Sequence, residues 1–266
     1  MSIDSHNHLD FDDFDADRAQ VIARARAAGV TGQIIAGVRP EDWPRQRALA
    51  ADWPDLRWTA GLHPQLAATL DAPARAAALD ALPAAFEGEH PACAVGEIGL
   101  DRQFVDKATL TAQTESFRAQ LAFARARDLP VVLHIVATHG KVLDILQRDG
   151  LPRAGGVVHS YSGSADMAEN YLRLGLHIGF VGTICRPAAK KLHRAARVVP
   201  DDRLLIETDA PTQSPPGHAR RNEPAALPVV AAALAAHRGT TAEHVLAATR
   251  RNAETLFGPF ASIGRT

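Results

Sequence analysis

Cysteine is scarce in this sequence. Its two cysteines, Cys93 and Cys185, allow one disulfide at most, and no CxxC pair is present. The scarcity excludes the disulfide framework on which many small secreted domains depend. A reduced, cytoplasmic setting is therefore the simpler interpretation.

Neither positive nor negative charge is in excess. Lysine plus arginine total 29 and aspartate plus glutamate total 30, so the net charge is −1. This balance excludes a protein-wide basic field for non-specific duplex binding, although a small local phosphate site is compatible with it. No run of about 18 apolar residues could span a membrane, and the N-terminus lacks the basic and long apolar stretches of a signal peptide. We expect no membrane partner, and nothing in the pattern indicates an obligate protein partner.

Three signatures of other architectures are also absent. The sequence has no GxGxxG loop, no Walker A loop and no internal repeat, and no low-complexity linker divides it. Hydrophobic residues make up 46% of the chain, which is enough to fill a sizeable core. We therefore expect one domain over residues 1–266, with its core at about 1–258.

What is present is an alternation of short β-type runs with longer helical runs. The expected strands are 1–4, 32–36, 56–60, 93–95, 131–133, 156–158, 176–180 and 204–206. The expected helices are 17–28, 43–52, 74–87, 110–127, 141–147 and 187–198, with two more near 223–237 and 241–256. Such alternation predicts parallel βα units, and about eight of them fit a closed TIM-type barrel with outer helices and an extra C-terminal helix. The Pro- and Gly-rich stretch 212–221 is either a loop over the barrel mouth or an ordinary surface connection.

Polar residues that can bind metals recur where the apolar part of each strand ends. His6 and His8 alternate along the first strand, so both imidazoles can point to one face. Later strand ends lead into His63, Glu97, His134, His159, Glu207 and Asp209. The C-terminal ends of all barrel strands open on one face, so these side chains should converge there. A satisfied, partly buried histidine would explain one of these positions but not the whole set.

The donor types indicate a hydrolase. Imidazole and carboxylate without thiolate suit Zn, Mn, Fe or Co, and also Mg when oxygen ligands dominate. Glu97 has two oxygens and can bridge two cations. Two such cations about 3.5–4 Å apart activate water and polarise the bond to be cut.

The ordered motifs resemble the TatD family of metal-dependent deoxyribonucleases over nearly the whole chain. They are Asp4–Leu9, Gly61–Pro64, Gly96–Asp101, Val158–Gly163 and Glu207–Pro211, with Arg221–Pro224 and Asn252–Phe257 towards the end. The resemblance implies a distorted TIM barrel of the amidohydrolase type with two divalent metal ions, Mg, Mn or Zn. It implies one metal on His6, His8, Glu97 and Asp209, and a second metal on Glu97, His134 and His159.

The resemblance also implies roles in catalysis. Asp209 would orient or deprotonate the attacking water, His63 would face the substrate phosphate, and Glu97 would join the two metals. Asp4 and Glu207 would orient the ligands, although Asp4 could instead be a simple strand-end cap.

One position departs from the family pattern. Many members carry an arginine two residues after the second-metal histidine, where this chain has Val136. Arg221 could replace that charge or be a solvated side chain, and we count Arg221 and Asn222 as candidate phosphate contacts. With so few cations we expect only one to three nucleotides to be bound. The alternative is a longer groove of surface arginines such as Arg18, Arg102 and Arg186.

The sequence thus predicts a metal-dependent phosphodiesterase, an exonuclease acting on DNA ends. One alternative is the same two-metal site used on another ester, an amide or an aminoacyl ester. The other alternative is a non-catalytic metal-binding barrel, which the complete ligand set argues against.

Overall fold

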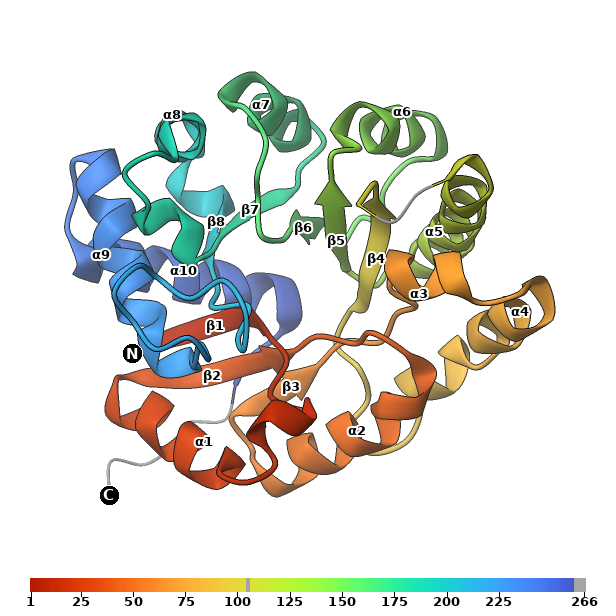
Figure 1. Ribbon diagram of the computed structural model, residues 1–266, viewed down its shortest axis with the longest axis horizontal. Coiled ribbons are helices and arrows are strands. Elements are labelled where there is room, and N and C mark those ends of the chain that lie inside the picture. The colour runs from red at the N-terminus through yellow and green to blue at the C-terminus, as the bar shows by residue number, and fades with distance from the viewer. Residues whose placement is uncertain (104–105, 261–266) are drawn as a thin grey trace.

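The described residues of the computed structural model, 1–103 and 106–260, form a ring of parallel strands surrounded by helices (Figure 1). Residues 261–266 of the expected domain lie outside the described part. The strands are β1 (Ser2–Asn7), β2 (Val30–Ile35), β3 (Leu56–Trp58), β4 (Val95–Asp101), β5 (Val131–Val136), β6 (Gly156–Val158), β7 (His177–Phe180) and β8 (Leu204–Ile206).

The ring closes through irregular contacts at two places. Strands β1 to β3 form one parallel ladder and β4 to β8 form another, both in chain order. On one side Ala60 pairs with Val95, with Ala60 N donating to Ala94 O at 3.1 Å and Gly96 N donating to Ala60 O at 2.9 Å. On the other side, Asp209 N donates to His6 O at 2.9 Å and His8 N donates to Ala210 O at 2.8 Å. The predicted parallel α/β barrel is therefore confirmed, and its distortion lies at these two irregular junctions between the ladders.

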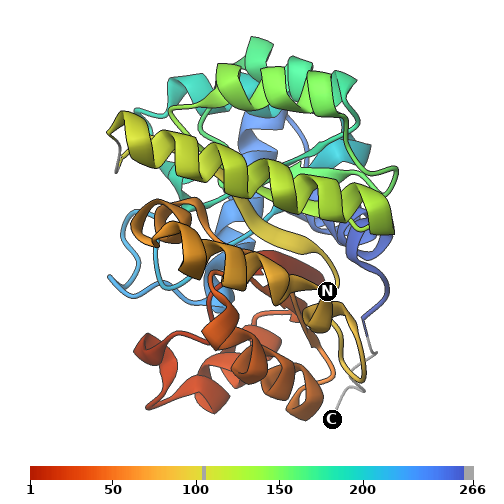
Figure 2. The ribbon, with the colours of Figure 1, turned by 90° about the vertical axis from the view of Figure 1, so that its right-hand side faces the viewer.

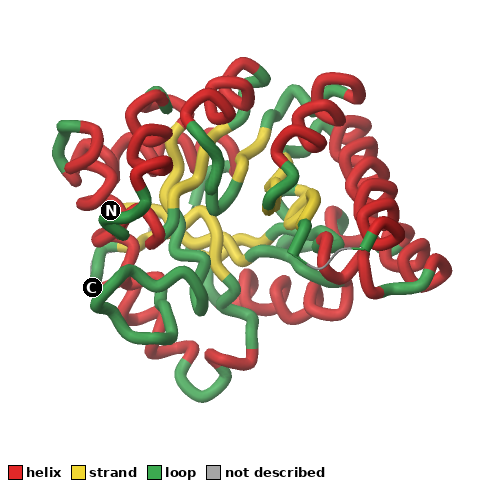
Figure 3. Tube along the Cα trace, turned by 45° about the horizontal axis from the view of Figure 1, so that its top comes forward, coloured by secondary structure: helices red, strands yellow, loops and turns green. Residues whose placement is uncertain are grey.

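Helices cover the outside of the strands (Figure 3). They are α1 (Arg18–Ala27), α2 (Trp43–Asp52), α3 (Pro64–Thr69), α4 (Ala72–Asp80), α5 (Lys107–Arg127), α6 (His139–Asp149), α7 (Ala165–Arg173), α8 (Lys190–Val198), α9 (Leu227–Arg238) and α10 (Ala242–Phe257). Short 3-10 helices include η1 (Asp12–Phe14), η2 (Pro40–Asp42), η3 (Leu82–Phe86), η4 (Gly182–Cys185), η5 (Asp201–Arg203) and η6 (Pro224–Ala226). Helices α9 and α10 both follow the last strand, as expected.

Several boundaries differ from the sequence expectation. Strands β4 and β5 extend past their apolar runs, because Glu97 and His134 lie inside the strands and not after them. The expected helix 74–87 is divided into α4 and η3, and α3 and α7 were not predicted. Helix α7 nevertheless has a clear local basis: the Ser164 hydroxyl caps it by accepting from Met167 N at 3.2 Å.

The barrel interior is apolar at one end only. Side chains of the strands, such as Ile3, Ile34, Val132 and Leu205, pack together inside the ring. Ala253, Leu256 and Phe257 of α10 close this end of the ring. Burying each large side chain contributes about 1.5–3 kcal/mol, so this apolar cluster stabilises the ring strongly. Polar side chains are left to the opposite end, where the strands terminate.

The open end of the barrel carries the loops that follow the strands. In Figure 2 the loop after β8 projects at the left, away from the N-terminus. It leaves the barrel just after Asp209 and returns at Asn222, whose side chain donates to Thr208 O at 2.7 Å. Within residues 1–103 and 106–260, no helix is both long and apolar enough to cross a membrane.

Candidate metal centre

Most of the predicted metal-binding side chains meet at the open end of the barrel. Their donor atoms form three overlapping groups, each within 4.8 Å: His6, His8 and Glu97; His63, Glu97 and His134; and His6, His159 and Glu207. Residues separated by up to 201 positions in the chain are thus brought into one cluster by the strand ends.

Glu97 lies at the centre of the cluster, and its two oxygens face different partners. Oε2 is 3.5 Å from His6 Nε2 and 3.8 Å from His8 Nε2. Oε1 is 2.7 Å from His134 Nδ1 and 2.8 Å from His159 Nε2. A carboxylate placed in this way is oriented to join two binding sites, one on each oxygen.

Asp209 completes the group around Oε2 of Glu97. Its Oδ1 is 3.4 Å from His8 Nε2 and 3.8 Å from His6 Nε2. The backbone of Asp209 has a φ of 52°, in the left-handed region, which aspartate tolerates better than most residues. Thr212 fixes the second carboxylate oxygen through a hydrogen bond of 3.3 Å.

The distances among His6, His8, Asp209 and Oε2 of Glu97 fit a divalent cation. A tetrahedral ion with bonds of about 2.0–2.2 Å separates its ligands by about 3.3–3.6 Å, close to the 3.4–3.8 Å found here. In the described part of the chain, the buried Nε2 atom of His6 has no hydrogen-bond partner. A neutral imidazole nitrogen that is buried and unsatisfied in this way is suited to coordinating a metal.

Two carboxylates hold the histidines near Oε1 of Glu97. Asp101 Oδ2 lies 3.1 Å from His134 Nε2, which turns Nδ1 of that ring towards Glu97. Glu207 Oε1 lies 3.5 Å from His159 Nδ1, and Ser5 donates to Glu207 Oε2 at 3.2 Å. A partner on the far ring nitrogen fixes the orientation of a metal-binding histidine.

Packing around Glu207 requires a glycine. A Cβ atom at Gly179 of β7 would lie 2.7 Å from Glu207 Oε2, too close for any side chain. The backbone N–H of Ser160 also donates to Glu207 Oε1. The carboxylate is therefore held from several directions, and the orientation of His159 is held with it.

Asp4 connects β1 to the segment that carries Asp209. It accepts hydrogen bonds from Thr208 N at 2.9 Å and from Thr208 Oγ1 at 2.5 Å, and also from Asn7 Nδ2 at 3.2 Å. Burial raises the pKa of Asp4 to about 7 despite these bonds. Asp4 thus connects β1 to the chain around Thr208.

His63 offers a donor to the cluster. Its Nδ1 accepts a hydrogen bond from Gln65 N at 3.2 Å, which places the proton of the neutral ring on Nε2. That Nε2 lies 3.2 Å from His134 Nδ1 and 3.5 Å from Glu97 Oε1. An N–H group here suits a substrate oxygen better than a cation.

The charges of the cluster are strongly coupled. Burial alone would raise the pKa of Glu97, but the charges of His159, His63 and His6 lower it well below its usual value. Burial and the neighbouring His159 lower the pKa of His6. Burial opposes protonation of His159, but Glu97 and Glu207 outweigh it and raise its pKa. Glu97 is therefore ionised among these histidines, and a cation bound to the histidine nitrogens would meet its negative charge.

Solvent reaches the cluster from one side. The side chains of His8, His63, His134 and Asp209 are 10–15% exposed, whereas those of His6, Glu97 and His159 are at most 4% exposed. A substrate can approach the first set while the second set stays covered.

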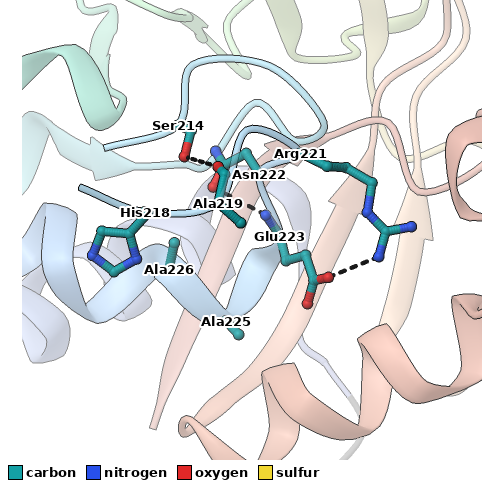
Figure 4. A pocket seen from close by; sticks show the side chains of 8 residues that line it. All are labelled: Ser214, His218, Ala219, Arg221, Asn222, Glu223, Ala225 and Ala226. Atoms are coloured by element: carbon teal, nitrogen blue, oxygen red, sulfur yellow. Dashed lines mark hydrogen bonds and ion pairs between the residues drawn. The ribbon is translucent and has the colours of Figure 1, made fainter. Parts of the chain in front are cut away.

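The two candidate phosphate contacts in the loop after β8 are engaged elsewhere. Arg221 makes two hydrogen bonds of 2.8 Å to Asp17 and one of 2.9 Å to Glu223. The Asn222 amide donates to Thr208 O and Thr212 O. Figure 4 shows both residues in a pocket of about 240 Å³ whose lining contains no member of the metal cluster. Their geometry is that of residues that anchor the loop.

Sequence reasoning missed Asp101. The signal was present, because Glu97 and Asp101 are four residues apart in one strand and therefore point to the same face. Burial opposes ionisation of Asp101, but hydrogen bonds from His134, Gln103 and Gln65 outweigh it and lower its pKa to about 2.

Comparisons with known proteins agree with this geometry. The model of the family described as TatD related DNase matches residues 3–258. The chain is 39% identical, over 92% of its own length and 94% of the other, to a protein of Dickeya dadantii named 3'-5' ssDNA/RNA exonuclease TatD. It is also 39% identical to the uncharacterized metal-dependent hydrolase YjjV of Escherichia coli, over 96% and 97% of the two chains. The crystal structure of YjjV superposes with a TM-score of 0.89 at 37% identity, over 96% of this chain and 97% of the other.

Proposed function

Because this chain belongs to the TatD-related DNase family and is a metal-dependent hydrolase, we propose that it cuts phosphodiester bonds at the ends of single-stranded DNA or RNA. The name of the Dickeya dadantii relative, a 3'-5' ssDNA/RNA exonuclease, supports this substrate class. The single domain over residues 1–266 and the cytoplasmic location stay predictions from the sequence.

The observation that carries the proposal is the placement of Glu97. Its Oε2 faces His6, His8 and Asp209, and its Oε1 faces His134 and His159. We propose that these two sets hold two divalent cations that share Glu97. Cations held there would supply Lewis-acid chemistry, which lowers the pKa of water and polarises a phosphoryl oxygen.

The protein's own side chains would divide the remaining work. The side chain of Asp209 is 11% exposed and has an oxygen at the open side of the cluster, so it would orient the attacking water and accept its proton. His63 would donate its Nε2–H to an unesterified phosphoryl oxygen as negative charge grows there. Asp101 and Glu207 would hold His134 and His159 in place throughout.

A second candidate substrate class follows from the lack of a nearby arginine. Val136 stands on the strand that carries His134, and Arg221 is bound to Asp17 and Glu223. With no free arginine at either of these two positions, the site is also compatible with a neutral ester, an amide or an aminoacyl ester.

A substrate panel on metal-reconstituted protein separates these classes. The panel contains single-stranded DNA, RNA, a small phosphodiester and an amide, and Glu97→Ala serves as the inactive control. We expect the highest kcat/KM on the oligonucleotides. Faster turnover of the amide, or equal cleavage of circular and linear DNA, would contradict an end-directed phosphodiesterase.

A further inference from the structure

The rim of the barrel mouth has an acidic half. The loops and first helical turns after β1 and β2 lie on the lower side of Figure 1, around α1 and α2. Their carboxylates are Asp10, Asp12, Asp13, Asp15, Asp17, Glu41 and Asp42. Their three arginines are bound to these carboxylates: Arg18 to Asp15 at 2.5 Å, Arg39 to Asp42 at 2.7 Å and Arg45 to Asp12 at 2.9 Å.

The opposite half of the rim is basic. Exposed cations follow β5 and β7, at the starts of α6 and α8: Lys141, Arg186, Lys190 and Lys191. Asp166 of α7 is the one carboxylate in the loops and first turns that follow β5, β6 and β7. None of the four cations has a carboxylate within ion-pair distance among residues 1–103 and 106–260. We call these four residues the basic rim.

Helix α8 presents its cations to solvent. Leu192, His193 and Ala195 are buried against the barrel, whereas Lys190 and Lys191 are exposed. Within residues 1–103 and 106–260, no side chain caps the start of α8, and the helix dipole adds positive potential at this end. The local field therefore favours an anion over this end of the helix.

The basic rim flanks the metal cluster. Tyr161 follows His159 by two residues, and its ring centroid is 5.6 Å from that of His139, the first residue of α6. His139 in turn bonds Tyr171 of α7 at 3.1 Å. Helix α7 packs against both α6 and α8, and burial, together with the charge of Lys191 on α8, lowers the pKa of His139 to about 4. The starts of α6, α7 and α8 thus form one continuous edge beside the cluster.

We propose that the basic rim binds the phosphates of a single strand beyond the bond that is cut, so that the strand leaves the site over α8 and not over α1 and α2. This inference rests on the proposed function and names the path of its substrate. A polyanion is repelled by the acidic half, where every arginine is already paired, and attracted by the unpaired cations opposite. Of the arginines considered from the sequence, Arg186 belongs to this path and Arg18 does not.

Binding at the rim is measured with a triple variant in which neutral glutamines replace three of its four cations. Arg186→Gln, Lys190→Gln and Lys191→Gln are combined, and Arg39→Gln with Arg45→Gln, which removes two positive charges, is the control from the acidic half. Fluorescence anisotropy of a labelled single-stranded oligonucleotide, with Ca²⁺ in the site, gives affinity against salt. Each phosphate contact contributes about 0.7 to the slope of log K against log salt, so the triple variant should lose about 2 from the slope and about tenfold or more in affinity. Lys191→Gln alone should lose about 0.7, and the control should match the wild type.

Hydrolysis of bis(p-nitrophenyl) phosphate keeps the two proposals separate. The triple variant should hydrolyse this small ester as the wild type does, because the metal cluster is untouched. If the wild type binds and cuts oligonucleotides but the triple variant binds them equally well, the path over α8 is wrong and the function stands. An equal loss of oligonucleotide affinity in the control variant also contradicts the path over α8. A wild type that turns over the small ester but neither binds nor cuts oligonucleotides overturns both proposals.

Discussion

His63 performs two structural tasks that a pair of substitutions can separate. Its Nδ1 caps α3 by accepting from Gln65 N, and its Nε2–H points to Glu97 and His134. His63→Ala removes both contacts. His63→Asn keeps a good capping side chain but is too short to reach the cluster.

The expected magnitudes differ for stability and for rate. Loss of the cap in His63→Ala should cost about 0.5–2 kcal/mol in the free energy of unfolding, and His63→Asn should cost little. Both variants should lose a factor on the order of 10²–10³ in kcat, which corresponds to about 3–4 kcal/mol of transition-state stabilisation. Both should keep their metal, because the proton on Nε2 leaves no lone pair there for a cation.

Three measurements on the two variants check this. Denaturant unfolding gives stability, elemental analysis gives metal content, and turnover of a single-stranded oligonucleotide gives kcat. Full activity in His63→Asn, or loss of metal from either variant, would show that His63 does not act as a substrate-facing donor.

Three further substitutions test the groups around the cluster. Asp101→Ala should weaken metal binding or activity by about 10- to 100-fold, because His134 loses the partner that orients it; calorimetric metal titration would show this, and unchanged affinity and activity would refute it. Asp209→Asn tolerates the left-handed backbone and should fold normally with little activity, so substantial turnover by this variant would exclude Asp209 as the proton acceptor. Arg221→Gln should keep activity and lose thermal stability at neutral pH. The hydrogen bond to Arg221 lowers the pKa of Asp17 below its usual value of 3.8. The loss of stability should therefore be complete above pH 3.8 and should shrink as the pH falls through the lowered pKa of Asp17. A loss of stability that does not depend on pH would count against the pairing.

Much of the fold and of the cluster could be predicted because both depend on strand order. Each apolar run marks a strand, and each strand end is delivered to one face of a barrel. His159 follows an apolar run directly and Asp209 follows one after two residues, so their convergence could be expected without any knowledge of side-chain geometry.

The strand ends themselves could not be read from hydrophobicity. Glu97, Asp101 and His134 are polar residues inside β4 and β5, so the apolar runs stop before the strands do. For the same reason Asp101 was overlooked, although it shares a face with Glu97. A polar residue that faces the mouth of a barrel looks like the start of a loop when only composition is considered.

Ion pairs between residues far apart in the chain also could not be predicted from the sequence. Arg221 and Asp17 are 204 residues apart, and nothing in either local segment indicates the other. Similarly, Arg18 and Arg186 are both surface arginines in a nearly neutral chain. Only the fold shows that Arg18 is bound to Asp15 while Arg186 stands among other cations.

The metal content of the reconstituted protein tests the central claim most directly. Elemental analysis should find two divalent ions per chain in the wild type. His8→Ala and His159→Ala should each lose one ion, and Glu97→Ala, which removes the carboxylate that faces both sets of ligands, should lose both. A wild type that binds a single ion, or a Glu97→Ala protein that keeps two, would contradict the shared two-metal centre.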